Sequence, residues 1–389
     1  MAGAQVQEEQ RAFHEPERRS PTRLVSVYGP NARLMRPWEI SMNKICLLLM
    51  VLALSAAADP AQPPANPEAS PEARAILKYI QGLTARTDKR VLSGQFTDCG
   101  AKASVSAAIF GQIQQRTGEC PAILGVDYAN WYDGQISSAA PNAAAIQQWR
   151  QGGLVQIEVH CGDPFRTNLA VSGLRDRNVD MAPLLDPESP AHTNWMRELD
   201  RMATGLQQLR DARVVVLWRP FHEMNGGWFW WGAQKPEVMI RLWRQMFDYF
   251  TQDRHLNNLL WVYAPNHGDH TADYYPGDHY ADLVGVDAYT DFVDPEHIKG
   301  TAELLALPKP FGFAEFGPHD PFNPPGDYDY LRFIDGVQKN FPRAVWFLSW
   351  HGNWGLTTNQ NVTALLHHPW VVSRADLPMV AGLRKEAGH

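Results

Sequence analysis

The sequence predicts an α/β fold, a (β/α)8 TIM barrel that forms a single catalytic domain. Apolar runs rich in β-branched and aromatic residues recur from residue 90 onward, and stretches with helical spacing of apolar residues separate them. Strand–helix alternation implies a parallel sheet, and eight repeats imply that the sheet closes. The eight runs are Arg90–Phe96, Ala122–Asp127, Leu154–His160, Arg213–Trp218, Leu259–Ala264, Leu283–Tyr289, Phe311–Phe316 and Ala344–Trp350.

Amphipathic stretches between these runs predict the helices. Between residues 235 and 251, for example, Val238, Leu242 and Met246 are spaced to share one helical face. The predicted helices are Ala143–Gln151, Ser189–Gln208, Lys235–Thr251 and Asp327–Asn340. A doubly wound open sheet is the alternative fold, but no glycine-rich phosphate loop follows the first run. The 389-residue length fits one barrel, since such barrels take about 250 residues or more.

The N-terminal region resembles an export signal preceded by extra sequence. Residues 42–58 combine a short basic start (Met42-Asn43-Lys44), an apolar run and small residues suited to cleavage after Ala58. We interpret residues 1–41 as an upstream extension from a misplaced start site. We therefore expect a secreted or periplasmic protein without a membrane anchor after signal cleavage.

A Pro/Ala-rich linker is expected to join the signal peptide to the catalytic domain. Residues 59–71 contain repeated prolines and favour an extended conformation. Ser70-Pro71-Glu72 then predicts a helix start, with Ser70 as N-cap and Pro71 at the first position. The catalytic domain is predicted to occupy residues 72–389.

The charged, aromatic and cysteine residues of the chain indicate which kinds of partner and covalent links to expect. The chain carries 35 Lys and Arg against 42 Asp and Glu, a net charge of −7, which argues against a nucleic-acid partner. Fourteen tryptophans suit stacking on a ligand. Three cysteines remain after signal cleavage, and we expect Cys99 and Cys120 to pair while Cys161 stays free. We also expect a monomer.

Polar and aromatic side chains gather where the predicted strands end. In a barrel of this kind the chemistry lies at the carboxyl ends of the strands. The residues there include Asp127, His160, Arg219, His222, Glu223, Trp228, Tyr289, Glu315 and Trp350. The mouth of the barrel is therefore expected to be lined by carboxylates, imidazoles and indoles.

Two of the carboxylates fit glycoside hydrolysis with retention of configuration. Glu223 and Glu315 follow the fourth and seventh runs, and side chains from these strands can meet across the mouth. The reaction needs one protonated and one ionised carboxyl group about 5–5.5 Å apart. Glu223 lies among tryptophans that would desolvate it and keep it protonated. Glu315 needs donors that keep it ionised, and Arg219 and Tyr289 are candidates.

The segment Trp218–Gly232, with the sequence Arg-Pro-Phe-His-Glu-Met-Asn-Gly-Gly-Trp-Phe-Trp-Trp-Gly after its first residue, resembles the acid/base motif of glycoside hydrolase family 26. That family is best known for endo-β-1,4-mannanases on a (β/α)8 barrel. Further similar segments follow in order along the chain, and the resemblance covers roughly residues 72–385. These segments are Gly285–Tyr289, Phe313–Gly317 and Ser349–His351.

The resemblance implies a role for each matching residue. Glu223 would be the acid/base and Glu315 the nucleophile, and Tyr289 would hydrogen bond to the nucleophile. His222 would orient the site. The resemblance implies substrate contacts for His160, Trp228 and Trp350, with Trp350 as the platform under the reacting sugar. We place Asp127 and Arg219 among the substrate-binding residues as well.

Two positions depart from the family pattern. His160-Cys161-Gly162-Asp163-Pro164 has Asp where the family has Asn, and His351 stands where some relatives have Arg. Both departures concern contacts with distal sugars. They leave the preferred polysaccharide open.

The sequence therefore predicts a secreted retaining endo-β-1,4-mannanase with a β-mannan substrate. A related β-glycanase acting on xylan or mixed-linkage glucan, or an exo-enzyme releasing mannobiose, would use the same two glutamates. An inactive carbohydrate-binding barrel is a further alternative, although a binder needs no carboxylate pair. We expect no cofactor and no metal, because the His267–His270 turn has no second cluster at useful spacing.

Overall fold

The eight predicted strands close into a parallel barrel. The computed structural model describes residues 62–131, 134–166, 173–319 and 324–377. Strands pair in chain order, and β9 closes the ring by pairing with both β8 and β2. The barrel strands are β2 (Gly94–Cys99), β3 (Ile123–Asp127), β4 (Leu154–Glu158), β5 (Val216–Arg219), β6 (Leu259–Tyr263), β7 (Leu283–Tyr289), β8 (Phe311–Gly317) and β9 (Ala344–Ser349). The predicted (β/α)8 fold is confirmed.

The first predicted run differs most from the structure. It is divided into β1 (Val91–Leu92) and β2, and the barrel strand ends at Cys99, three residues beyond the predicted end at Phe96. The short β1 pairs with β10 (Val371–Val372), so a segment near the end of the described chain lies beside the segment that leads into the first barrel strand. Ser93 separates the two strands, and its hydroxyl donates to the carbonyl of Val372.

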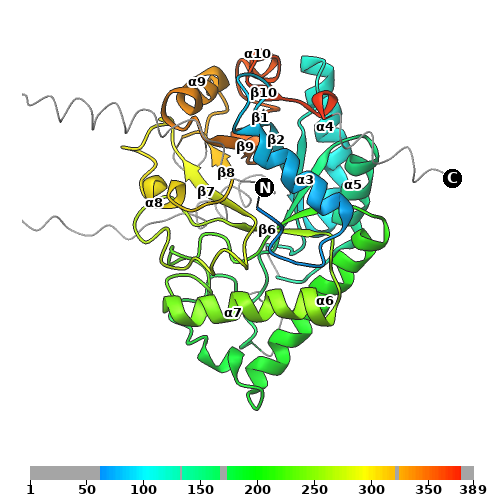
Figure 1. The fold of residues 1–389 in the computed structure, drawn as a ribbon, viewed down its shortest axis with the longest axis vertical. Coiled ribbons are helices and arrows are strands. Elements are labelled where there is room, and N and C mark those ends of the chain that lie inside the picture. The colour runs from blue at the N-terminus through cyan, green and yellow to red at the C-terminus, as the bar shows by residue number, and fades with distance from the viewer. Residues whose placement is uncertain (1–61, 132–133, 167–172, 320–323, 378–389) are drawn as a thin grey trace, which may run out of the picture. The chain divides into compact units, whose positions relative to one another are not determined.

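Helices cover the outside of the barrel, as Figure 1 shows. They are α3 (Pro71–Leu83), α4 (Ser106–Thr117), α5 (Ala139–Arg150), α6 (Pro190–Asp211), α7 (Pro236–Asp248), α8 (Thr301–Leu305), α9 (Tyr330–Asn340) and α10 (Val362–Leu366). The four predicted helices correspond to α5, α6, α7 and α9, and a π-helical turn, Tyr249–Asp253, extends α7. The connection between β6 and β7, residues 264–282, is described throughout and forms no helix. Three short 3-10 segments lie at Gly100–Val105, Ala182–Leu185 and Gly352–Trp354, and a fourth at Arg374–Asp376.

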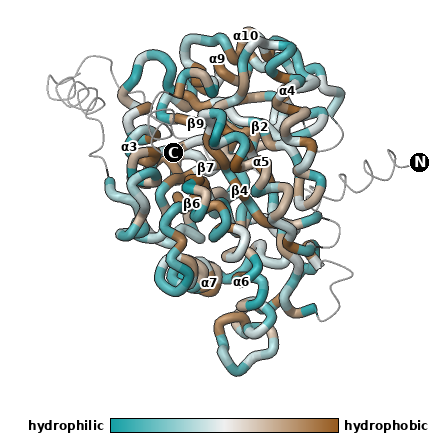
Figure 2. Tube along the Cα trace, turned by 90° about the vertical axis from the view of Figure 1, so that its right-hand side faces the viewer, coloured by the Kyte–Doolittle hydropathy of each residue, from teal (hydrophilic) through white to brown (hydrophobic). Residues whose placement is uncertain are grey.

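Large side chains fill the barrel because glycines on neighbouring strands leave room for them. Phe347 contacts Phe333 of α9, so the next residue, Leu348, points to the barrel interior. A Cβ atom at Gly94 or at Gly125 would lie 2.7 Å from a methyl carbon of Leu348. Figure 2 shows hydrophobic stretches gathered around the labelled strands. The side chains at the strand ends therefore lie above a closely packed barrel interior.

The N-terminal part of the described chain packs on the barrel. Ser70 caps α3 by accepting from the amide of Ala73, and Pro71 occupies the first helical position, as predicted. The amide of Ala65 donates to the buried carboxyl of Asp282 at 2.7 Å. This part of the predicted linker is thus hydrogen bonded to the barrel.

Some predictions concern residues outside the described ranges. The upstream extension (residues 1–41) and the signal peptide (residues 42–58) both lie there. Within the described ranges, no helix combines the length and the apolar composition that a membrane crossing requires.

The predicted disulfide between Cys99 and Cys120 is wrong. Cys99, Cys120 and Cys161 are all free and buried. Cys99 ends β2 opposite Asp127, the last residue of β3, whereas Cys120 precedes the first residue of β3. The two thiols therefore lie at opposite ends of the same strand pair, roughly 15 Å or more apart along the strands, beyond the reach of a disulfide.

Leu348 and Gly125 provide a test of the barrel packing. Leu348→Ala should lower the free energy of unfolding by about 2–5 kcal/mol through the cavity it leaves. Gly125→Ala should also destabilise, because the added methyl group would overlap Leu348. The free energy of unfolding of the double variant should fall by less than the sum of the two single effects, since the added methyl group enters the space that Leu348 vacates. Urea unfolding measures all three.

Leu331→Ala, at a half-buried position of α9, is the matched control and should cost clearly less than Leu348→Ala. Strict additivity of the Leu348 and Gly125 changes would contradict the packing described here.

Candidate active site

The loop that follows β5 holds Glu223 in a strained backbone conformation. Phe221 and Glu223 have φ angles of 49° and 55°, in the left-handed region that costs a non-glycine residue on the order of 1 kcal/mol or more. The amide of Glu223 donates to the carbonyl of Ala264 at 2.8 Å. The Trp231 indole donates to the carbonyl of His222 at 2.9 Å. These contacts hold the acidic side chain in one direction.

Glycines in the same loop let Trp228 fold back onto Glu223. The indole N–H of Trp228 donates to Oε2 of Glu223 at 2.6 Å. A Cβ atom at Gly226 would lie 2.2 Å from Cη2 of Trp228, and one at Gly232 would lie 2.0 Å from the carbonyl oxygen of Gly226. The two glycines are therefore required for this contact.

The surroundings of Glu223 favour its protonated form. Its side chain is buried, and desolvation raises its pKa to about 8. The negative charge of Glu315 is the second cause of the rise. The Trp228 hydrogen bond and the charges of Arg219 and Arg175 oppose it with smaller effect. The predicted protonating environment of Glu223 is thus present.

Glu315, on β8, accepts hydrogen bonds from the two predicted donors. Nη2 of Arg219 donates to Oε2 at 2.9 Å, and the Tyr289 hydroxyl donates to Oε1. Burial and the charge of Glu315 raise the pKa of Tyr289 well above its usual value, so that the phenol keeps its proton. A Cβ atom at Gly317 would lie 2.4 Å from the Tyr289 ring. Glycine there lets the ring lie across β8.

Arg219 joins three strands at the centre of the site. Its guanidinium is completely buried and bonds to Glu158 of β4, Asp287 of β7 and Glu315 of β8. Both β4–β5 and β7–β8 pairing support this arrangement, because Glu158 is the register partner of Arg219 and Asp287 that of Glu315. Arg219 is therefore ion paired with Glu315 and shielded from solvent.

The sequence prediction of the site omitted Glu158 and Asp287. Both stand at strand ends, and Asp287 lies two residues before Tyr289 in a segment already singled out. A count of buried charges could have found them, because a buried arginine beside Glu315 needs further carboxylate partners.

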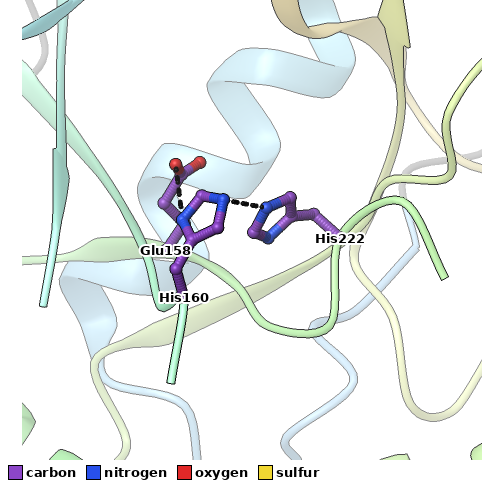
Figure 3. Close-up of side chains that lie close together, drawn as sticks. All are labelled: Glu158, His160 and His222. Carbon is purple, nitrogen blue, oxygen red and sulfur yellow. Dashed lines mark hydrogen bonds and ion pairs between the residues drawn. The ribbon is translucent and has the colours of Figure 1, made fainter. Parts of the chain in front are cut away.

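His160 and His222 form a buried chain with Asp127, and Figure 3 shows a nitrogen of one imidazole ring facing a nitrogen of the other. The Nε2 atoms of the two histidines lie 2.8 Å apart. Nδ1 of His160 contacts the Asp127 carboxylate and lies 3.8 Å from Oε1 of Glu158. The predicted sugar contact of His160 would therefore involve a ring whose two nitrogens both have protein partners.

Glu158, His160 and His222 are close enough together to suggest a metal site. In Figure 3, however, Glu158 and His222 approach different nitrogens of the His160 ring. Two nitrogens on one tetrahedral zinc ion lie about 3.3 Å apart, given bonds of about 2.0–2.1 Å. The 2.8 Å spacing of the Nε2 atoms is instead that of a hydrogen bond. The arrangement is a chain of hydrogen bonds.

Asp127 is placed behind the site. Its carboxylate is 0% exposed. It accepts from the amides of Ala129 and His160, from the Trp131 indole and from the His160 ring. Because neither carboxylate oxygen of Asp127 is exposed, Asp127 cannot make the direct substrate contact that the sequence predicted.

Aromatic rings flank the site on the side of β9. Trp350 stacks on Phe96 with ring centroids 4.1 Å apart and on Trp131 with centroids 5.6 Å apart. Trp131 and Trp228 are half-buried, so parts of both indoles face solvent. Trp230 and Trp231 are fully buried among other aromatic rings.

The arrangement places a carboxyl group with a raised pKa and a carboxyl group bonded to a guanidinium and a phenol in one buried site. A carboxyl group with a raised pKa can donate a proton to a leaving oxygen. A carboxylate held by a guanidinium and a phenol can attack an electrophilic carbon. Aromatic rings beside them can stack on the apolar faces of sugars.

Comparisons with known proteins cover nearly all of the described chain. The sequence model of glycosyl hydrolase family 26 matches residues 65–376. The mannan endo-1,4-β-mannosidase A and B of Caldalkalibacillus mannanilyticus is 36% identical over 323 residues, which are 78% of this chain. The chain spans 60% of the length of that relative. A mannan endo-1,4-β-mannosidase of Bacillus subtilis is 34% identical over 86% of this chain and 95% of its own.

The fold comparison agrees with the sequence comparison. The solved structure of a Bacillus subtilis mannanase matches with a TM-score of 0.74 and 32% identity, over 81% of this chain and 96% of that one. Together with the match to residues 65–376, these similarities show that the chain belongs to glycosyl hydrolase family 26.

Proposed function

We propose that this chain is a retaining endo-β-1,4-mannanase that hydrolyses mannan-type polysaccharides by double displacement. One observation carries the proposal: two buried carboxyl groups lie in opposite electrostatic environments. Burial raises the pKa of Glu223 to about 8, while Glu315 accepts hydrogen bonds from Arg219 and Tyr289. Membership of family 26 and the mannan-hydrolysing names of its relatives support mannan as the substrate.

We further propose that the protein is exported and that its signal peptide is removed. Residues 42–58 have the composition of a signal peptide, and a polymeric substrate lies outside the cell. N-terminal sequencing of the exported protein tests this point. A mature chain that retains residues before Met42 would contradict it.

The first step forms a glycosyl-enzyme ester. An oxygen of Glu315 attacks the anomeric carbon of the bound mannosyl unit, and the bond from that carbon to the leaving oxygen breaks. Glu223 transfers its proton to the leaving oxygen, which departs as a hydroxyl group on the released chain. The guanidinium of Arg219 and the phenol of Tyr289 orient the nucleophile.

The second step reverses the first with water as the acceptor. Glu223, now ionised, takes a proton from a water molecule as the water oxygen attacks the anomeric carbon. The ester bond to Glu315 breaks, and the sugar leaves with its original configuration. Both carboxyl groups return to their starting states.

The two glutamates should respond differently to removal. Glu315→Ala should lower kcat at least about a thousandfold on mannan and on activated aryl mannosides alike, because both need the nucleophile. Glu223→Ala should lower kcat about 10²–10⁴-fold on mannan. The same variant should still form the ester readily from aryl mannosides with good leaving groups, because these need no protonation. Steady-state and burst kinetics measure both effects.

Glu296→Ala, at an exposed position after β7, is the control and should leave both rates unchanged. Equal losses on both substrate types for Glu223→Ala would refute the assignment of roles.

Product analysis tests the reaction and the substrate together. Incubation with mannan should give internal cleavage to a mixture of oligosaccharides, with the β-anomer released first in NMR spectra. Xylan and mixed-linkage glucan should be cleaved far more slowly. An α-anomer would overturn the retaining mechanism, and mannobiose as the sole early product would indicate an exo-enzyme. Cleavage of none of the three would favour a carbohydrate-binding barrel.

The pKa of Glu223 should set the alkaline limit of activity, and the Trp228 hydrogen bond should lower that limit. Glu223 must be protonated to donate, so kcat/KM should fall as the pH rises through about 8. The indole N–H stabilises the ionised form of Glu223 and so lowers its pKa. Trp228→Phe keeps an aromatic ring but removes that donor, so the alkaline limb should move to higher pH. The pH dependence of kcat/KM measures the shift.

Trp230→Phe is the matched control, because its indole donates to the carbonyl of Cys161 and not to Glu223. Its alkaline limb should stay in place. A Trp228→Phe limb at lower pH would contradict the role given to this hydrogen bond.

A further inference from the structure

The two carboxylate oxygens of Asp127 have separate partners. Oδ1 accepts from two backbone amides, Ala129 at 2.7 Å and His160 at 3.2 Å. Oδ2 accepts from two side chains, the Trp131 indole at 2.9 Å and Nδ1 of His160. One oxygen thus fixes the turn after β3, and the other fixes two rings at the mouth of the barrel.

The carboxylate determines which nitrogen of His160 carries a proton. A carboxylate accepts hydrogen bonds, and Oδ2 already accepts from the Trp131 indole, so Nδ1 of His160 is the donor in its contact with Oδ2. Glu158, 3.8 Å from the same nitrogen, adds a second negative charge that favours a proton there. Asp127 and Glu158 therefore determine the tautomer of His160 through Nδ1, the nitrogen that does not face His222.

The tautomer of His160 constrains His222 in turn. Their Nε2 atoms lie 2.8 Å apart, and two nitrogens at that distance hold a single proton between them. With its proton on Nδ1, neutral His160 accepts at Nε2, so Nε2 of His222 is the donor. His222 is the residue before Glu223, and its carbonyl accepts from Trp231. The chain of contacts thus reaches the backbone that carries the acid/base.

Oδ2 of Asp127 also orients Trp131, which belongs to the aromatic rings beside β9. Trp131 stacks on Trp350, with an angle of 18° between the rings, and its N–H is bound to Oδ2 of Asp127. Asp127 therefore contacts both the histidine pair and the indole beside the proposed sugar platform, while its own carboxylate is shielded from solvent.

We propose that Asp127 is a positioning residue for the reaction. It fixes the protonation of the His160–His222 pair and the orientation of Trp131, and acts on bound sugar only through them. This inference goes beyond the proposed function but depends on it for its kinetic consequence. The tautomer itself is independent of any activity.

Asp127→Asn is a selective variant because an amide has one acceptor and one donor end. Its oxygen can replace Oδ1 and keep the two backbone bonds. Its NH2 group would then face Nδ1 of His160 and the N–H of Trp131. His160 must release its Nδ1 proton and carry a proton on Nε2, and the Trp131 bond is lost. The variant reverses the tautomers of both histidines, because Nε2 of His222 must then accept, and leaves the turn in place.

NMR of protein with ¹⁵N-labelled histidine rings reads the tautomers directly, with His160→Gln to assign the signals. In the wild-type protein Nδ1 of His160 should be protonated. In Asp127→Asn the proton should lie on Nε2. On mannan, kcat/KM of the variant should fall about 10- to 100-fold, the effect of losing a hydrogen bond to a charged group.

Asp294→Asn is the matched control. Asp294 also accepts from two backbone amides and from Nδ1 of a histidine, His297, but in an exposed loop. This change should leave kcat/KM and the His160 signals unaltered. Trp131→Phe removes only the indole bond and should leave the His160 tautomer as in the wild-type protein.

Each outcome bears on the proposal. An unprotonated Nδ1 in wild-type His160 would overturn it without any variant, as would an unchanged tautomer in a folded Asp127→Asn protein. A reversed tautomer with unchanged kcat/KM would remove its catalytic part. If the wild-type protein cleaved no mannan, the proposed function would fail while the tautomer result stood.

Discussion

The buried guanidinium of Arg219 is the contact on which the active site depends. A charge removed from water is stable only when ion pairs and hydrogen bonds replace its hydration. Arg219 finds them in Glu158, Asp287 and Glu315, which come from three different strands. Removing the cation would leave these carboxylates buried together without compensation. The same contact orients Glu315 and links the ends of β4, β7 and β8 to β5.

One cation among several carboxylates also explains why the two glutamates differ. Glu315 is hydrogen bonded to Arg219, whereas Glu223 has the Trp228 indole as its hydrogen-bond donor. Burial raises the pKa of Glu223, and the negative charge of Glu315 raises it further. Burial raises the pKa of Asp287 as well. The different surroundings of Glu223 and Glu315 therefore follow from one uneven distribution of charges and hydrogen-bond donors. Tryptophan takes part as a hydrogen-bond donor as well as a stacking surface, a use that the count of fourteen in the sequence did not indicate.

The barrel and the glutamate pair could be predicted because their signals are local. Alternating apolar runs and amphipathic stretches give the order of elements, and a strand-end Glu among tryptophans implies desolvation. Contacts set by register could not be predicted in the same way. Asp287 meets Glu315 only because the β7–β8 register shifts after Val286, and Cys99 misses Cys120 because its strand runs to the opposite end of the pair. Asp127 was placed correctly at a strand end, but its burial depends on Trp131 and His160 folding over it.

The coupling between the two glutamates gives the proposed reaction its order. The charge of Glu315 is one of the causes that raise the pKa of Glu223. When Glu315 forms an ester with the sugar, that charge disappears, and the pKa of Glu223 must fall. The group that began as an acid then becomes ionised and can accept a proton from water in the second step. Hydrolysis of the ester restores the charge on Glu315 and raises the pKa of Glu223 again. Burial and the charge of Glu315 together prepare Glu223 for the first step of the proposed reaction, and loss of that charge favours the ionised form that the second step needs.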